Sequence, residues 1–265
     1  MNDKVENKKE PIAKQQKNEL AITEADMLAD ANSGLENVTS EDLAIPFLRI
    51  TQAQSPQVNS RDGKYIKDCE QGDIFNTVDN TLYKGDKGVV VVPVAYRRNY
   101  LEWMPERKGL AAVHESSEIL KEVSRSERGQ DYLPNGNLLS TTANHYVLVL
   151  DEQGGFNQAI IAFGGSQLKK SKKWNSIMSG LKIRTKDGNV FTPPTFSHKY
   201  KLTSVVEQND QGSWFGWDIS LDEQLGADDG FIYSAAKQFS QNVNTGSVKA
   251  SQQDIHTVYI IALCL

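Results

Sequence analysis

The hydrophobic positions of this chain alternate with polar ones mainly at the two-residue period of β-strands. The clearest runs are NHYVLVL at residues 144–150 and FNQAIIAF at residues 156–163, separated by the turn-forming segment Asp151–Gly155. Two alternating runs joined by a short polar turn predict a β-hairpin. We therefore expect a hairpin over residues 144–163.

A second hairpin is predicted between residues 196 and 221. Aromatic and aliphatic residues alternate with polar ones through FSHKYKLT, a turn of Asn, Asp, Gln and Gly follows, and the chain resumes with SWFGWDISL. Strand alternation places Phe215, Trp217 and Ile219 on one face and Trp214 on the other. We expect Trp214, rather than Trp217, to be the exposed ring.

Shorter strands are predicted towards the N-terminus. Residues 43–58 carry apolar side chains around Pro46 and Pro56 and favour an extended edge segment. Turn-forming pairs between residues 72 and 86 indicate a meander of short strands. The continuous apolar run VVVVPVAY, residues 89–96, predicts a strand buried on both faces, with Pro93 at a bulge or an edge.

Two helices are expected to pack on the strands. The run LKKSKKWNS follows the first hairpin and is compatible with a basic helix. Near the C-terminus, Asp228-Asp229 is a suitable N-cap. The helix that follows it would carry Phe231, Ala235 and Phe239 at a spacing of four, which fits packing on a barrel. The pattern as a whole predicts a mainly β (α+β) domain, an open barrel of five or six strands.

Three segments fall outside this pattern. Residues 1–41 are rich in Lys, Glu, Asn and Gln and almost free of aromatics, so we expect a mostly disordered arm. Within it, residues 21–31 are compatible with a short amphipathic helix that forms on binding a partner or, as we favour, with a transient solvated helix. Residues 105–140 are polar, and we expect a long loop insertion that leaves the sheet as a lid or tethered loop. Residues 251–265 form an apolar C-terminal extension of the domain at 42–250.

Charge and cysteine usage narrow the class of protein. The 265-residue chain has a formal net charge of −5, which argues against a clamp for duplex DNA but allows a binder of single strands with a local basic groove. Its two cysteines form no metal or disulfide pattern, which fits a reducing compartment. No signal peptide or membrane-spanning apolar run is recognisable, so we expect a cytoplasmic protein without a membrane partner, in the host cell if viral.

Basic and aromatic residues gather in two regions of this net-acidic chain, at 97–103 and at 169–217. Lysine and arginine can neutralise phosphates while flat rings stack on unpaired bases, so this combination indicates single-stranded nucleic acid. A lysine run is also typical of a solvated helix face, and strand aromatics are typical of a core; both alternatives stay open. The candidate phosphate contacts are Arg97, Arg98, Lys169, Lys170, Lys172, Lys173, Lys199 and Lys201. The candidate stacking rings are Tyr100, Trp103, Trp174, Tyr200, Trp214 and Trp217, some of which must fill the core.

Catalytic motifs are not recognisable. The chain has no phosphate-binding glycine loop, no His-Glu-x-x-His helix and no Gly-x-Ser-x-Gly elbow, and its four histidines are scattered. We therefore expect no enzyme, no cofactor and no metal site.

Four stretches together resemble a group of tailed-bacteriophage proteins. They are IPFLRI…QSPQV…GDIFNT, VVVVPVAYRRNYLEW, LKKSKKWNS and PPTFSHKYKLTSV…GSWFGW, within residues 43–250. The group is regarded as single-stranded-DNA-binding proteins with an OB-type barrel. The resemblance implies an OB-like fold that binds single-stranded DNA with little sequence preference during phage replication, recombination and repair. Replication or recombination proteins would be partners, and the resemblance allows a homo-oligomer.

One departure and two rival functions accompany this resemblance. Proteins of this function commonly end in an acidic tail that recruits partners, whereas this chain ends in TVYIIALCL. The apolar end and the acidic arm favour the alternative of a non-enzymatic virion component or host-factor inhibitor built on the same β-scaffold. A nuclease would need a carboxylate cluster that the sequence does not assemble.

Overall fold

The computed structural model describes residues 23–39, 42–210 and 212–250, in two compact units that divide between Thr39 and Ser40. The first unit contains the helix α1, Glu24–Ala29, so the helix expected within residues 21–31 is present. Thr23 caps it: its hydroxyl accepts from the backbone N–H of Asp26, and the Asp26 carboxylate accepts from that of Thr23. The rest of the predicted arm, residues 1–22, and the extension at 251–265 lie outside the described residues.

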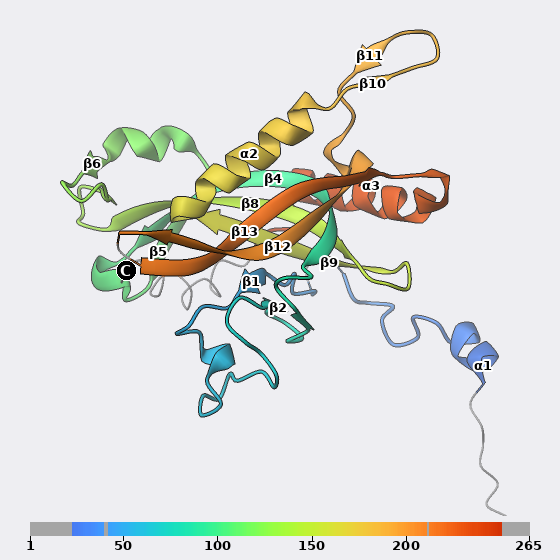
Figure 1. Ribbon diagram of the computed structural model, residues 1–265, viewed down its shortest axis with the longest axis horizontal. Helices are drawn as coiled ribbons and strands as arrows, with labels where there is room; N and C mark the ends of the chain where they lie inside the picture. The colour runs from blue at the N-terminus through green and yellow to red at the C-terminus, as the bar shows by residue number, and fades with distance from the viewer. Residues whose placement is uncertain (1–22, 40–41, 211, 251–265) are drawn as a thin grey trace, which may run out of the picture. The chain divides into compact units, whose positions relative to one another are not determined.

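The second unit is built on a large antiparallel sheet that curls into a half-barrel (Figure 1). Its strand order is β13-β12-β4-β8-β7-β6, with β9 also paired to β8 and β5 also paired to β4. The bounds of these strands are β4 Val89–Trp103, β5 Leu110–His114, β6 Ser124–Arg125, β7 Asp131–Tyr132, β8 Leu138–Leu150, β9 Phe156–Gly164, β12 His198–Asn209 and β13 Gly212–Gln224. The predicted mainly β class and both predicted hairpins, β8–β9 and β12–β13, are therefore confirmed.

Smaller elements complete the unit. One small sheet has the order β1-β2-β3 and the other is the hairpin β10–β11. Their bounds are β1 Leu48–Ile50, β2 Ile74–Asn76, β3 Leu82–Tyr83, β10 Ile183–Arg184 and β11 Val190–Phe191. The helices are α2 Leu168–Gly180 and α3 Gly230–Thr245, and short 3-10 turns occur at Pro56–Val58, Pro105–Arg107, Ser117–Glu122, Gly165–Gln167, Thr195–Ser197 and Ala227–Asp229.

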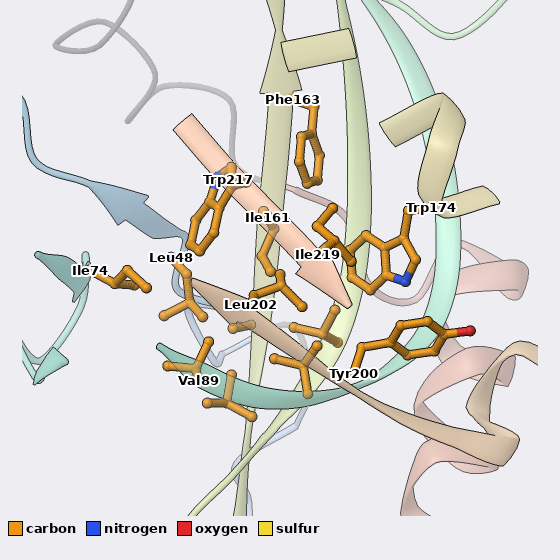
Figure 2. Close-up of a cluster of buried hydrophobic side chains, with 14 of the residues drawn as sticks. Leu48, Ile74, Val89, Ile161, Phe163, Trp174, Tyr200, Leu202, Trp217 and Ile219 are labelled. Carbon is orange, nitrogen blue, oxygen red and sulfur yellow. The ribbon is translucent and has the colours of Figure 1, made fainter. Parts of the chain in front are cut away.

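The sheet buries both of its faces. One face packs with Trp174 and Met178 of α2, and Figure 2 shows Trp174 and Tyr200 inside this cluster. The other face packs against α3. Val91 belongs to the first cluster and Val92 to the second, so β4 is buried on both faces as predicted. The register of β4 against β8 shifts between Pro93 and Ala95, which is the predicted bulge.

The open side of the half-barrel is bridged by the chain around β1. The backbone N–H of Ile160 in β9 donates to Pro46 O at 2.8 Å, and Phe47 forms an isolated parallel bridge with the same residue. Farther along, the amide of Gln52 bonds both the N–H and the C=O of Phe215 in β13, each at 2.9 Å. A side-chain amide thus takes the place of a neighbouring strand at this edge, where unpaired backbone groups are otherwise a liability.

Residues 105–140 return to the sheet in part, which the prediction of a continuous loop did not include. β5 pairs with β4 through Tyr100–Trp103, and β7 pairs with β8. The reason lies in the register of β12, which covers only Val89–Val91 of β4. At the far end of the same strand, Tyr100–Trp103 need hydrogen-bond partners, and β5 supplies them.

The buried stripe of α3 is also shifted from the predicted one. It consists of Ile232, Ala236, Phe239 and Val243. Phe231 is 70% exposed, because the stripe runs one residue later than the spacing through Phe231 and Ala235 indicated. The N-cap lies at Asp229, within the predicted pair.

Candidate nucleic-acid interface

Helix α2 has one buried face and one exposed, basic face. Ser171, Trp174 and Met178 recur at helical spacing and are buried, whereas Lys169, Lys172 and Lys173 are exposed. The helix contains no acidic residue. None of these exposed lysines pairs with a carboxylate of the described residues. The helix therefore offers three cations to an anionic partner.

His145 of β8 anchors the buried face of α2. Its ring stacks on the indole of Trp174 with centroids 4.5 Å apart and an interplanar angle of 12°. Its Nε2 lies 2.8 Å from the hydroxyl of Ser171. Desolvation by burial lowers the pKa of His145 to about 3, so the imidazole is neutral at neutral pH. This histidine is part of the core contact that holds the basic helix in place.

Five of the six predicted stacking rings lie in the core, the four described here and Trp217, which corrects their assignment. Trp174 and Tyr200 are 0% exposed, Trp103 is 1% exposed and Tyr100 is 4% exposed. They belong to the three buried clusters on and around the half-barrel. These rings cannot meet a base while the domain stays folded.

Trp214 differs from the other three tryptophans because its ring is only partly buried. Trp217 is 5% exposed and belongs to the core, as strand alternation predicts, while Trp214 lies on the opposite face of β13. Trp214 is the direct cross-strand partner of Glu207 in β12. Its indole Nε1 donates to Glu207 Oε2 at 3.1 Å, which fixes the edge of the ring.

Glu207 connects this ring to α2. Its Oε1 lies 2.9 Å from Nζ of Lys170, and its Oε2 accepts from Nε2 of Gln167 at 2.7 Å. Burial acts to raise the pKa of Glu207, but the bonds from Lys170 and Gln167 outweigh it and hold the pKa below its usual value. The carboxylate is therefore ionised at neutral pH.

Gln167 bonds both Glu207 of β12 and the backbone of the edge strand β13. Its Oε1 accepts from the backbone N–H of Trp217 at 3.0 Å, while its Nε2 bonds Glu207. This close approach requires Gly216 beneath it: a Cβ there would stand 2.7 Å from Nε2 of Gln167 and 2.8 Å from Cδ of Glu207. Neither Gln167 nor Glu207 was a candidate from sequence, because no local pattern marks a contact between residues forty positions apart.

The lysines of α2 extend from this contact around the helix. Lys173 follows Lys170 by three residues and Lys169 by four, so the three side chains share one side of the helix. Lys170 marks the side nearest Trp214 through their common partner Glu207. Lys201 is exposed and has the same strand parity as Glu207, so it lies on the same face of β12.

The other predicted cations are separated from this surface or engaged. Nζ of Lys199 lies 2.8 Å from Glu223 and 3.2 Å from Asp229, so its charge is balanced inside the protein. Arg97 donates to the backbone oxygen of Val243 and to the side chain of Asn244, at the C-terminal end of α3. Lys199 is therefore held in internal ion pairs, which corrects its assignment as a phosphate contact, whereas Arg97 is exposed and has no carboxylate partner among the described residues, so its assignment stays a prediction.

Arg98 is exposed, and its Nε donates to the hydroxyl of Tyr96 at 3.2 Å. The structure therefore brings together Lys169, Lys170, Lys173 and Trp214, with Lys172 one turn after Lys169 on the exposed face of the same helix and Lys201 along β12. Arg98 is not joined to this group by any contact of the described residues.

Comparison of the sequence with known proteins gives one family match, which covers most of the chain. The model of a family described as Pam3 phage gp34-like protein matches residues 14–249. No curated protein matches, and no solved structure matches. Among the described residues, no helix is long and apolar enough to span a membrane, and no group of three or more His, Cys, Asp or Glu is placed to hold a metal ion.

Proposed function

We propose that this chain, which belongs to the Pam3 phage gp34-like protein family, binds single-stranded DNA with little sequence preference. On this proposal the half-barrel is an OB-like scaffold, and the protein covers exposed strands during phage replication, recombination and repair. Binding requires no catalytic step, metal or cofactor. The proposal is supported by one arrangement, the ring of Trp214 held beside the lysines of α2.

The Trp214 ring meets the requirements of a stacking platform. Bases of every kind have a flat face, so stacking on an indole tolerates any sequence. Because Glu207 already holds the Nε1 edge of Trp214, the ring needs no reorientation before a base meets its face. Lys170 forms an ion pair with the same carboxylate, so the positive charge that is free to meet a phosphate comes from Lys169 and Lys173, which share its side of α2.

The exposed lysines supply the electrostatic part of binding. Lys169, Lys172 and Lys173 lie on a helix without acidic residues, so the local potential is positive although the chain carries −5 overall. Each phosphate that they neutralise releases counterions, which makes affinity fall with salt. A single strand can bring its phosphates to these lysines and its bases to Trp214 at once.

Tryptophan fluorescence tests the proposal directly. The protein is titrated with oligo-dT at two salt concentrations, with a matched duplex as the control. We expect quenching by the single strand, weaker at the higher salt and small for the duplex. Because Trp103, Trp174 and Trp217 are buried, the quenching should come from Trp214 and disappear in Trp214→Phe. Unchanged fluorescence together with no binding at low salt would contradict the proposal and direct the search to a protein partner.

A further inference from the structure

A short hairpin projects from the body of the second unit directly after α2 (Figure 1). In β10–β11, Ile183 pairs with Phe191 and Arg184 pairs with Val190. The turn is fixed by backbone bonds between Thr185 and Asn189 and between Gly188 and Thr185, with Gly188 at φ +86°. Only glycine adopts this left-handed conformation without strain, so the sequence specifies the turn.

The hairpin is strongly basic. Lys182, Arg184 and Lys186 are exposed, and Asp187 is the only acidic residue between 182 and 192. Nζ of Lys182 bonds the hydroxyl of Thr192, and Nη1 of Arg184 donates to Gly188 O at 3.3 Å. None of the three cations forms an ion pair with a carboxylate of the described residues. Their charge is available to an outside anion.

The hairpin also exposes apolar surface. Val190 is 52% exposed and Phe191 is 45% exposed. A ribbon with two residue pairs buries too little of its own surface to be stable alone. Such a projecting ribbon, with cations and apolar side chains together, fits a partner that offers both phosphates and the apolar faces of sugars and bases.

We propose that the β10–β11 hairpin is a second contact for the DNA strand that lies on α2, with Lys182, Arg184 and Lys186 neutralising phosphates beyond the C-terminal end of the helix. This inference rests on the proposed function. The exposed lysines of α2 and the cations of the hairpin follow one another along the chain from Lys169 to Lys186, so they can form one basic track. The exposed lysines of α2 end at Lys173, and the last seven residues of the helix, about 10 Å at 1.5 Å per residue, carry no cation before Lys182, so the track has two basic parts that one strand would have to span.

Salt dependence measures the contact. On single strands each neutralised phosphate contributes about −0.7 to the log–log slope of affinity against salt. The triple variant Lys182→Gln/Arg184→Gln/Lys186→Gln should therefore have a slope shallower by about 2. Across a fourfold rise in salt, the wild-type affinity for oligo-dT should fall about twentyfold more than that of the variant.

A matched variant controls for overall charge. Lys64→Gln/Lys67→Gln/Lys87→Gln removes the same charge from exposed lysines in the segment between β1 and β4. It should leave the slope unchanged. An equal change of slope in the two triple variants overturns the inference, because the effect would then come from net charge. Lys182→Arg/Lys186→Arg, which keeps the charges, should retain the wild-type slope, and thermal melting of each variant reports folding.

The outcome separates this inference from the function on which it rests. If the wild type binds oligo-dT with quenching that depends on Trp214 but the hairpin triple variant keeps the wild-type slope, the hairpin is not a contact and the proposed function stands. If the wild type does not bind oligo-dT at low salt, the proposed function and the hairpin contact are both wrong.

Discussion

The carboxylate of Glu207 holds the indole of Trp214 across the β12–β13 pair, with Oε2 and Nε1 3.1 Å apart. The same carboxylate is bound by Lys170 and Gln167 from the N-terminal part of α2 and the turn before it. A ring on the sheet and a basic helix are thus joined through one anion. This contact defines the candidate interface.

Two replacements of Trp214 should affect the fluorescence quenching and the affinity for oligo-dT differently. Trp214→Phe keeps a flat ring, so binding of oligo-dT should persist while fluorescence quenching is lost. Trp214→Ala removes the stacking face and should weaken binding by about 1–3 kcal/mol. Affinity is measured by anisotropy of a labelled oligonucleotide. Wild-type quenching in Trp214→Phe would place the contact at another tryptophan.

Gln52 should stabilise the fold through its two hydrogen bonds to the backbone of the edge strand β13. Gln52→Ala leaves the N–H and the C=O of Phe215 without the partners that the side chain provides, and two hydrogen bonds of this kind contribute about 1–3 kcal/mol to the free energy of unfolding. Urea unfolding measures the loss. Gln54→Ala, which truncates an exposed glutamine two residues away, should change stability by less than about 0.5 kcal/mol. Equal effects of the two variants would contradict the role of Gln52.

Local patterns were sufficient for the two long hairpins and for β4, but not for the short strands β5–β7 and β10–β11 or for the pairing of residues 105–140. The hairpins 144–163 and 196–221 follow from alternation and turn residues, because the two strands of each hairpin are consecutive in sequence. The edge of β4 that β5 joins is free because β12, about a hundred residues away in sequence, pairs only with Val89–Val91. Sequence periodicity carries no information on that register.

The candidate site was predicted only in part, because some of its contacts also join segments that are far apart in sequence. Trp174 recurs at helical spacing with Ser171 and Met178, so the 3.6-residue period of α2 was a usable signal that this ring is buried. No such signal existed for Lys199, because its partners Glu223 and Asp229 come from distant segments. Charge and ring type in a sequence identify candidates, and tertiary contacts decide which of them are accessible.

Glu102 should make stability depend on acid pH. Its carboxylate accepts from Asn137 at 2.6 Å, from Asn135 at 2.8 Å and lies 2.8 Å from Nε2 of His114. The bonds from Asn137 and Asn135 hold the pKa of Glu102 below its ordinary 4.5, against the effect of burial. As the pH falls below 4.5, this carboxyl group therefore takes up a proton in the unfolded chain before it does so in the folded protein. The stabilisation that the ionised Glu102 provides is lost as the pH falls further, through its pKa in the folded protein.

The variant Glu102→Gln tests this effect. At neutral pH it should be less stable than the wild type by about 1–3 kcal/mol, because charge-assisted bonds are replaced by neutral ones. The difference should shrink as the pH is lowered below the folded pKa of Glu102. Urea unfolding at a series of pH values measures it, and a difference that stays constant into the acid range would contradict the depressed pKa.

His145 should affect stability over a different pH range. Burial lowers its pKa from 6.5 to about 3, so below pH 6.5 the unfolded state binds a proton that the folded state does not. Stability should then fall by up to about 1.4 kcal/mol per pH unit between these two values. NMR of the histidine ring should show one imidazole that stays neutral down to about pH 4. Titration of all four histidines near 6.5 would contradict the buried contact with Trp174.

The lysines of α2 and β12 should differ in their effect on DNA binding although the sequence alone grouped them together. Lys169 and Lys173 are exposed on one side of α2, so Lys169→Gln/Lys173→Gln should leave thermal stability unchanged and make the salt slope for oligo-dT shallower by about 1.4. Lys199 is held between Glu223 and Asp229, and Lys199→Gln removes those ion pairs. That variant should lower stability and leave the slope unchanged, because its charge is already balanced within the protein. A slope that changes as much per lysine in Lys199→Gln as in the α2 variant would mean that long-range charge, and not contact at α2, governs binding.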